Sequence, residues 1–228
     1  MKTIGLIGGM SWESSALYYS AINREISKRK GGLHSAPILM HSVDFAPIAE
    51  QQAAHDWAGL GAIMADSAQR LERAGAQAIF LATNTMHNVA DKIEAAVDLP
   101  FVHIADPTAA ALLSDGIERV ALLGTAFTME MPFYKDRLRA KGLDVVVPEV
   151  NITNLSGIIY NELCKGIVSD QSRTIYVEAI QQLQARGAEA VILGCTEITM
   201  LINDDDSPIP TYDTTALHAK AAADFILS

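Results

Sequence analysis

One of the two cysteines in this chain stands where a thiol could do chemistry. Cys195 follows the apolar run "EAVILG" (189–194) and opens the polar segment "CTE". Such a run predicts a buried strand, and ligands of α/β sheets bind at the carboxyl ends of strands. A helix beginning there would lower the pKa of the thiol and supply thiolate. We therefore interpret Cys195 as a reactive residue and Cys164, in "NELCKG", as a packing residue.

A second polar segment repeats the setting of Cys195. When residues 71–87 are set over 183–199, five of 17 positions are identical at an offset of 112, and Thr83 falls on Cys195. Segments 4–11 and 120–127 match at an offset of 116, and segments 106–110 and 213–217 at 107. Offsets this similar predict two related halves, the alternative being chance similarity between two strand–helix units.

The pattern of apolar runs gives the elements that would position these residues. Short runs rich in Ile, Val, Leu and Phe predict buried strands at 3–8, 37–43, 77–82, 101–104, 119–124, 144–148, 189–194 and 209–213. Longer patterns predict helices at 14–29, 57–74, 87–96, 107–114, 130–141, 170–186 and 214–227. Gly75 and Gly187 stand where glycines end two of these helices. Alternation of this kind predicts an α/β fold with parallel sheets.

Two such halves would bring four loops to one cleft. These loops, at the carboxyl ends of predicted strands, are 8–11, 83–85, 124–128 and 195–197. A pseudo-twofold axis would place Thr83 and Cys195 on opposite sides of a molecule bound in that cleft. The small polar residues in these loops have simpler roles as alternatives: Asn84 and Thr85 as turn formers, and Glu197 as the cap of its own helix.

Composition excludes several classes of function. The formal charge is −10 and no basic run is present, so we expect no nucleic-acid binding. No stretch approaches 18 apolar residues without a charge, so we expect no membrane span. Nothing marks secretion, which favours a reduced, cytoplasmic chain. Histidine and cysteine spacing predicts no metal site, and "GLIGGMS" lacks the spacing of a dinucleotide-binding loop.

Lys165 and His87 each have both a structural and a functional interpretation. Lys165, beside Cys164, is a solvated lysine or a cation that binds a substrate carboxylate. His87 is a residue hydrogen-bonded within its own helical turn, or a group that returns protons to Thr83. There is no G-x-S-x-G motif and no P-loop, so neither a hydrolase nor an NTPase is favoured.

The motifs "IGLIGGMSWES", "HSVDF", "TNTMH", "LGT", "CKG" and "GCTEI" together resemble the aspartate/glutamate racemase superfamily. The likeness is greatest to its bacterial L-aspartate/glutamate-specific, broad-specificity racemases. The resemblance implies two pseudosymmetric Rossmann-like domains, at 1–102 plus 213–228 and at 103–212, with the active site in the cleft between them. It also implies a homodimer, an amino-acid substrate and catalysis without PLP or another cofactor.

The resemblance also assigns roles to residues. In most members two cysteines transfer the α-proton on opposite faces of the substrate; here those positions hold Thr83 and Cys195. The positions that bind the substrate and its carboxylates correspond to Met10, Gln51, Asn84, Thr85, Thr125, Thr128, Lys165, Thr196 and Glu197. Gln51 stands near the place where close relatives carry arginine.

Threonine in place of the first cysteine predicts an asymmetric enzyme. A thiolate is a workable base near neutral pH, whereas a threonine hydroxyl has a pKa far above neutrality and serves only as a proton donor. We therefore expect Cys195 to act well on one enantiomer, and the resemblance favours the L-form. The alternatives are a decarboxylase of malonate-type acids, which needs a single proton donor, and a non-catalytic dicarboxylate-binding module.

Overall fold

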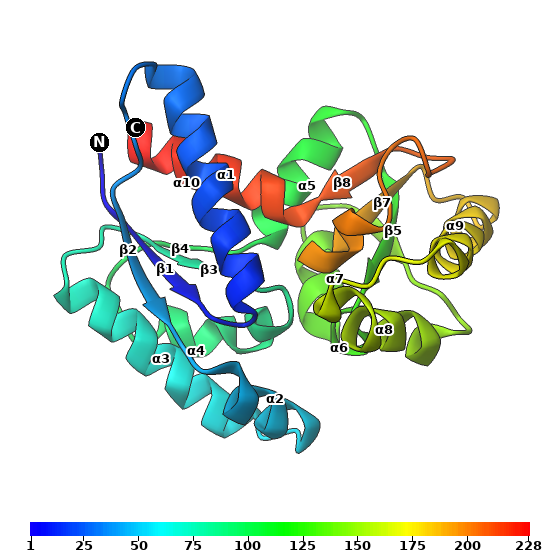
Figure 1. The fold of residues 1–228 in the computed structure, drawn as a ribbon, viewed down its shortest axis with the longest axis horizontal. Helices are drawn as coiled ribbons and strands as arrows, with labels where there is room; N and C mark the ends of the chain where they lie inside the picture. The colour runs from blue at the N-terminus through cyan, green and yellow to red at the C-terminus, as the bar shows by residue number, and fades with distance from the viewer. The chain divides into compact units, whose positions relative to one another are not determined.

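The computed structural model describes all residues, 1–228, and they form two compact units (Figure 1). Unit 1 comprises Met1–Ile104 and His218–Ser228, and unit 2 comprises Ala105–Leu217. Each unit holds one four-stranded parallel sheet with helices packed on it. The predicted α/β fold with two related halves is therefore confirmed.

The sheet of unit 1 has the strand order β2-β1-β3-β4. Its strands are β1 (Ile4–Gly8), β2 (Ile38–Ser42), β3 (Ile79–Leu81) and β4 (Phe101–Val102). Its helices are α1 (Trp12–Lys30), α2 (Phe45–Ala53), α3 (Trp57–Arg73), the 3-10 helix η1 (Thr85–Val89) and α4 (Ala90–Glu94). One face of this sheet packs against α3, η1 and α4, and the other against α1 and the C-terminal part of α10. Two apolar layers thus hold the strand ends in place.

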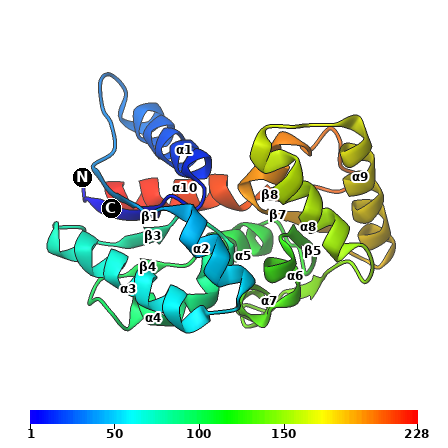
Figure 2. The same cartoon turned by 60° about the horizontal axis from the view of Figure 1, so that its bottom comes forward.

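The sheet of unit 2 has the strand order β6-β5-β7-β8; its strands β5, β7 and β8 are labelled in Figure 2. Its strands are β5 (Arg119–Gly124), β6 (Asp144–Val146), β7 (Ala190–Gly194) and β8 (Thr211–Asp213). Its helices are α5 (Ala105–Ser114), α6 (Ala126–Glu130), α7 (Pro132–Arg139), α8 (Ile152–Asn161), η2 (Leu163–Lys165), α9 (Asp170–Ala185) and η3 (Thr196–Met200). Helix α10 (Thr214–Leu227) starts in unit 2 and ends in unit 1. One large apolar cluster joins α8, α9, η2 and η3 to β5 and β7.

The strand registers of the two sheets repeat the offsets found in the sequence. Ile7 pairs with Leu81 in unit 1, and Leu123 pairs with Leu193 in unit 2. The offset from 7 to 123 is 116 and that from 81 to 193 is 112, so the same pair of positions faces each other in both units. The outer strands differ: Phe101 and Thr211 occupy equivalent register positions, which gives an offset of 110 instead of the expected 107.

Side-chain caps explain where several helices begin. The hydroxyl oxygen of Ser11 accepts from the Ser14 N–H at the start of α1, and a carboxylate oxygen of Asp56 accepts from the Gly59 N–H in α3. Such caps satisfy backbone donors that have no partner within the helix. At the other end of α3, Gly75 has a φ of 97°, a conformation that favours glycine, as the sequence predicted.

The structure corrects several element boundaries. The helix predicted at 87–96 is divided into η1 and α4. The one predicted at 130–141 is α7, which begins at Pro132, and the helix before it, α6, was not predicted. Met131 is extended there, and Pro132, which cannot continue a preceding helix, opens α7. Helices α2 and α8 were not predicted. Strands β2, β4 and β8 lie at sheet edges and are partly exposed, contrary to the expectation that every strand is buried. None of the helices combines the length and apolar character needed to cross a membrane.

Candidate active site

The thiol of Cys195 has a carboxylate as its direct partner. Cys195 is half-buried directly after β7, and its Sγ donates a hydrogen bond to Oε2 of Glu197 at 2.9 Å. The backbone there is extended (φ −155°, ψ 135°) before η3 begins at Thr196. This geometry directs the side chains two residues apart toward each other, so Glu197 can accept the thiol proton.

The expected lowering of the Cys195 pKa is wrong. Burial raises the pKa of the thiol well above its ordinary value, and the negative charge of Glu197 raises it further. The helix after the strand is a five-residue 3-10 helix in place of an α-helix, and no side chain caps it. Such a short helix offers little positive potential to oppose burial and a neighbouring carboxylate. Cys195 is therefore a protonated thiol in this structure.

Two tyrosines near Cys195 carry no sequence signal for a role in the site. Burial raises the pKa of Tyr160 on α8, and interactions with Cys195 and Glu197 raise it further; its hydroxyl hydrogen-bonds to Thr125. Tyr176 on α9 is fully buried near Cys195, with its hydroxyl donating to the Leu155 carbonyl at 2.9 Å. Both stay neutral at physiological pH; Tyr176 is fully buried, whereas Tyr160 is 38% exposed.

A second pair of hydroxyls lies at the start of α6, directly after β5. Thr125 caps this helix, accepting from the Thr128 N–H at 3.3 Å, and the two hydroxyl oxygens lie 3.2 Å apart. The Ala126 N–H donates to the Ser156 hydroxyl at 3.0 Å. Thr125 also touches Tyr160, so this loop and the Cys195 loop belong to one cluster in unit 2.

Lys165 and Thr196 lie on short helices that pack together. Lys165 is the exposed last residue of η2, and η2 packs against η3, which begins at Thr196. Thr196 is buried, and its hydroxyl lies 3.4 Å from that of Thr215 on α10. Unit 2 thus brings together five of the predicted site residues: Thr125, Thr128, Lys165, Thr196 and Glu197, around Cys195.

In unit 1, Thr83 is half-buried two residues after the end of β3, and the residues that follow it are buried. Asn84 and Thr85 are each 6% exposed, and Thr85 starts η1. The Nδ1 atom of His87 lies 2.8 Å from the Thr83 carbonyl oxygen, which confirms that His87 is hydrogen-bonded within its own turn. Its Nε2 accepts from the Ile104 N–H at 3.1 Å. With both nitrogens engaged by the backbone, His87 cannot return protons to the Thr83 hydroxyl, and that alternative is wrong.

Two further predicted residues face the interior of unit 1. The Met10 side chain is 5% exposed and belongs to the apolar layer under α3, so only its backbone is placed to meet a ligand. Oε1 of Gln51 is buried without a hydrogen-bond partner and lies 2.8 Å from where a Cβ on Gly59 would be. Its neighbour Gln52 donates from Nε2 to the Met86 sulfur at 3.1 Å, joining α2 to η1.

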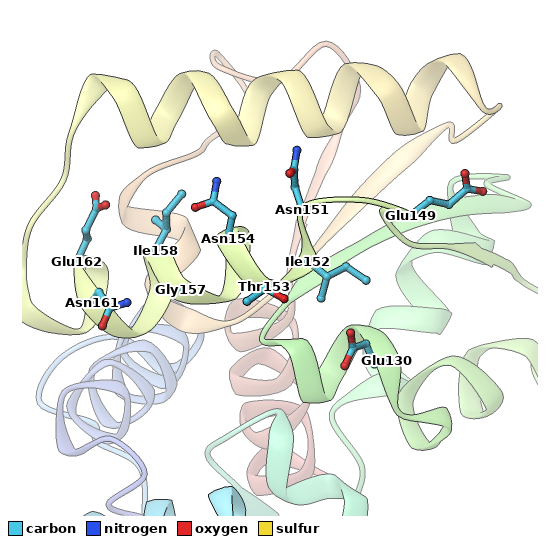
Figure 3. Close-up of a pocket in the computed structure, with 10 residues that line it drawn as sticks. All are labelled: Glu130, Glu149, Asn151, Ile152, Thr153, Asn154, Gly157, Ile158, Asn161 and Glu162. Atoms are coloured by element: carbon cyan, nitrogen blue, oxygen red, sulfur yellow. The ribbon is translucent and has the colours of Figure 1, made fainter.

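A groove of about 780 Å³ runs along α8 in unit 2, away from these residues. It is lined by Glu130, Glu149, Asn151, Ile152, Thr153, Asn154, Gly157, Ile158, Asn161 and Glu162. Figure 3 shows that their side chains point in different directions and do not converge on one point. Two of the three carboxylates already have protein partners, Glu149 with Arg186 and Glu162 with Ser172. The groove contains none of the predicted site residues.

Comparisons with known proteins were made for the whole chain. The family model described as Asp/Glu/Hydantoin racemase matches residues 7–222. The broad-specificity amino-acid racemase RacX of Bacillus subtilis is 23% identical over 231 residues, covering 99% of this chain and 98% of that protein. Both ends of the chain thus fall within the similarity.

Two solved structures match the full length of the chain. A proposed Asp/Glu racemase from Yersinia pestis is 49% identical, with a TM-score of 0.95 and 100% of each chain covered. An aspartate racemase homologue from Pyrococcus horikoshii is 35% identical, with a TM-score of 0.86 and the same coverage. The Thr83 and Cys195 loops lie within the matched region in both comparisons.

Proposed function

The chain belongs to the Asp/Glu/Hydantoin racemase family, and we propose that it is an amino-acid racemase acting on aspartate and glutamate without PLP or another cofactor. The observation that carries this proposal is the thiol–carboxylate pair of Cys195 and Glu197 at 2.9 Å, at the end of a strand whose counterpart ends in Thr83. Racemisation needs one proton removed from the α-carbon and one returned on the opposite face.

On the first face, Cys195 and Glu197 act as a proton-transfer pair. The thiol proton moves to Glu197, which gives a thiolate and a neutral carboxylic acid. The thiolate then removes the α-proton of the substrate and becomes a thiol again, and the substrate becomes a carbanion. A positively charged substrate ammonium near the sulfur favours this step, because a nearby positive charge lowers the pKa of a thiol.

On the second face, Thr83 donates its hydroxyl proton to the carbanion. The resulting alkoxide is a strong base and is reprotonated by water, because both ring nitrogens of His87 are hydrogen-bonded to the backbone. The hydroxide that forms takes up the proton of the Glu197 carboxylic acid, which restores the carboxylate and closes the cycle. The reverse path would require Thr83 to lose its proton before substrate is activated, and a hydroxyl rarely does so near neutral pH. We therefore expect α-proton exchange to be unequal for the two enantiomers, and the resemblance to L-specific racemases favours the L-enantiomer as the one that exchanges faster.

The substrate carboxylates are held by short polar groups in both units. Thr125, Thr128 and Thr196 offer hydroxyls, and Lys165 offers a mobile positive charge at the exposed end of η2. In unit 1, the backbone and side chains of Asn84 and Thr85 serve the same purpose. Groups fixed before the substrate arrives stabilise the carbanion with little reorganisation. Gln51 would bind a carboxylate through its side-chain NH₂ group, because its buried Oε1 is an acceptor.

The experiment that tests this function is chiral analysis of D- and L-amino acids after incubation with the purified protein, beginning with aspartate and glutamate. Deuterium incorporation in D₂O, measured separately for each enantiomer, identifies the face on which exchange occurs. We expect racemisation without added PLP and faster exchange with one enantiomer. Equal exchange of both enantiomers would contradict the asymmetric mechanism, and no turnover of any amino acid would contradict the function.

One observation favours a second candidate function. A thiol whose pKa is raised stays protonated and can give its proton to a strongly basic carbanion, and a decarboxylase of malonate-type acids needs one such donor for the carbanion left by loss of CO₂. Release of CO₂ from substituted malonates, lost in Cys195→Ala, would support this function. A racemase is expected to release none.

A further inference from the structure

His87 is enclosed by aromatic rings within unit 1. Its ring centroid lies 4.4 Å from that of His103, 5.5 Å from that of Phe101 and 6.1 Å from that of His218. The side chain is only 2% exposed, so it is not placed to touch a substrate. A polar ring in such surroundings must find its hydrogen-bond partners inside the protein.

Its two hydrogen bonds fix a single protonation state. The Ile104 N–H can only donate, so Nε2 of His87 must carry the lone pair that accepts it at 3.1 Å. The proton therefore sits on Nδ1 and is donated to the Thr83 carbonyl oxygen at 2.8 Å. Burial, followed by the neighbouring His103 and His218, lowers the pKa of His87 well below its ordinary value. The ring is thus a neutral bridge from Thr83 to Ile104.

Ile104 is the last residue of unit 1 before the backbone enters unit 2. The backbone leaves unit 1 between Ile104 and Ala105, and it returns to unit 1 between Leu217 and His218. Ile104 donates to His87, and the His218 ring lies against that of His87. Both passages of the backbone between the units therefore adjoin the histidine cluster, which we define as His87, His103 and His218.

His218, where the backbone returns to unit 1, is also held by hydrogen bonds at both ring nitrogens. Nε2 of His218 lies 2.8 Å from the Val102 carbonyl oxygen, which can only accept, so this nitrogen carries the proton. Nδ1 of His218 then accepts from the Tyr18 hydroxyl at 3.0 Å. Both ring nitrogens of His87 and of His218 are thus hydrogen-bonded within unit 1.

The equivalent loop in unit 2 lacks this bridge. The residue at the His87 position is Thr199 (87 + 112), whose hydroxyl donates to the Thr196 carbonyl at 2.7 Å. The Cys195 carbonyl accepts from the Ile198 N–H, a bond within the η3 turn. Unit 1 therefore has a side-chain bridge, His87, between Thr83 and Ile104, and the Cys195 loop of unit 2 has no equivalent of it.

We propose that His87 is a positioning residue for Thr83, holding the Thr83 carbonyl through Nδ1–H while Ile104 fixes the other edge of the ring. This inference rests on the proposed role of Thr83 as proton donor. A hydroxyl that serves as a weak acid depends on close alignment with the acceptor carbon, and small misplacements of reacting groups are costly. Cys195 needs no equivalent bridge, because its side chain is oriented directly by Glu197.

Two amide substitutions separate the two bonds of the ring. The side-chain nitrogen of Asn overlies Nδ1 of histidine, so His87→Asn keeps the donor to Thr83 and loses the acceptor for Ile104. The amide of Gln reaches the Nε2 position, so His87→Gln keeps the acceptor and loses the donor. His218→Gln is the matched control, because it is equally buried in the same cluster and has no bond to Thr83.

Two rates are measured for each variant: the rate of racemisation, and the rate of the α-proton exchange that depends on Cys195 and is therefore lost in Cys195→Ala. The quantity compared is the first rate divided by the second. We expect this ratio to fall about ten- to a hundredfold in His87→Gln and to recover largely in His87→Asn. His218→Gln should keep the wild-type ratio even where its melting temperature falls. Equal losses in His87→Gln and His87→Asn, or a parallel fall of both rates, would overturn the proposal.

A measurement on the wild-type protein guards against variants that do not fold. Nitrogen-15 NMR of the His87 ring should report the Nδ1–H tautomer, unchanged from pH 5 to pH 8; the opposite tautomer or a titration in that range would overturn the proposal. Wild-type protein that neither exchanges nor racemises any amino acid would overturn the proposed function as well. Wild-type activity with an unchanged ratio in His87→Gln would overturn the positioning role alone.

Discussion

The loops after β3 and β7 occupy equivalent places in two sheets of the same strand order, but they are held in opposite ways. In unit 1 the backbone of Thr83 is held by His87, a neutral ring buried among other rings. In unit 2 the side chain of Cys195 is held by the carboxylate of Glu197. The registers of the strands before them are the same.

This difference shows that the two copies of the repeat share their strand order and register but differ in the group at the strand end and in what holds that group in place. A thiol gains from an acceptor that takes its proton, and Glu197 supplies one. A hydroxyl that only donates gains more from fixed placement, and His87 supplies that without carrying charge. The two sides of the proposed reaction are thus unequal both in the reacting group and in what supports it.

The largest expected effect comes from removing the thiol. Cys195→Ala should lower α-proton exchange and racemisation by about 10³-fold, because general acid–base groups contribute on that order. The assay is deuterium incorporation into D- and L-aspartate. Cys164→Ala is the control, since Cys164 is exposed on η2 and has no assigned part in the reaction. A Cys195→Ala variant that keeps its activity would contradict the proposed role of Cys195 as the base.

A smaller loss is expected from removing the proton acceptor. Glu197→Gln should lower kcat by about 10²-fold, because the thiol proton loses its destination. The same change should lower the pKa of Cys195, because the charge of Glu197 raises it in the native protein. Alkylation rates measured against pH in a Cys164→Ala background check the second point. A rise of the thiol pKa, or unchanged kcat, would contradict the role of the pair.

A moderate gain is expected from making the two loops alike. Thr83→Cys should raise exchange of the enantiomer that the wild-type protein handles poorly by about tenfold, because a thiol is a far better base than a hydroxyl. Thr83→Ser, which keeps a hydroxyl, is the matched control and should give no such gain. If a folded Thr83→Cys variant gains nothing, Thr83 does not face the substrate.

The smallest expected effect is on stability against pH. The pKa of His87 is lowered on folding, so below its unfolded value of about 6.5 the unfolded chain binds a proton that the folded chain does not. The free energy of unfolding should therefore fall as pH drops below 6.5, by at most about 1.4 kcal/mol per pH unit for this group. Urea titrations at several pH values measure it.

In His87→Asn the contribution of this residue to the pH dependence should be absent, and the slope between pH 6.5 and pH 5 should be shallower than in the wild-type protein. The remaining slope would report the other titrating groups of the chain. An unchanged slope would mean that His87 titrates alike in the folded and unfolded chains.

Much of the fold could be predicted from the sequence. All eight strands lie within the predicted ranges, and the resemblance drawn from "TNTMH" and "GCTEI" is confirmed by the family match. Helices α2 and α8 were missed because α2 contains Pro47 and α8 follows the left-handed Asn151, so neither begins with a simple pattern. The prediction of a helix at 87–96 failed because a 3-10 turn precedes α4.

Less of the site could be predicted. The two strand-end residues could be placed by the repeat, but Tyr160 and Tyr176, whose pKa values are raised in part by Cys195, belong to helices that carry no motif. The bond between Cys195 and Glu197 has a local spacing that could have revealed it, two residues apart after a strand. Its effect on the pKa could not be read from spacing, because burial by other segments contributes most.

The sequence by itself determined which residues stand at the ends of β3 and β7, because strand periodicity and the internal repeat are local properties of the chain. The tertiary structure decided the protonation states of those residues and of their supports. Thiol and imidazole pKa values depend on burial and on charges brought near by distant segments, such as the His218 ring beside His87. A thiol expected to supply thiolate is therefore protonated, and His87 is a neutral ring hydrogen-bonded to the backbone, in agreement with the first of its two predicted roles.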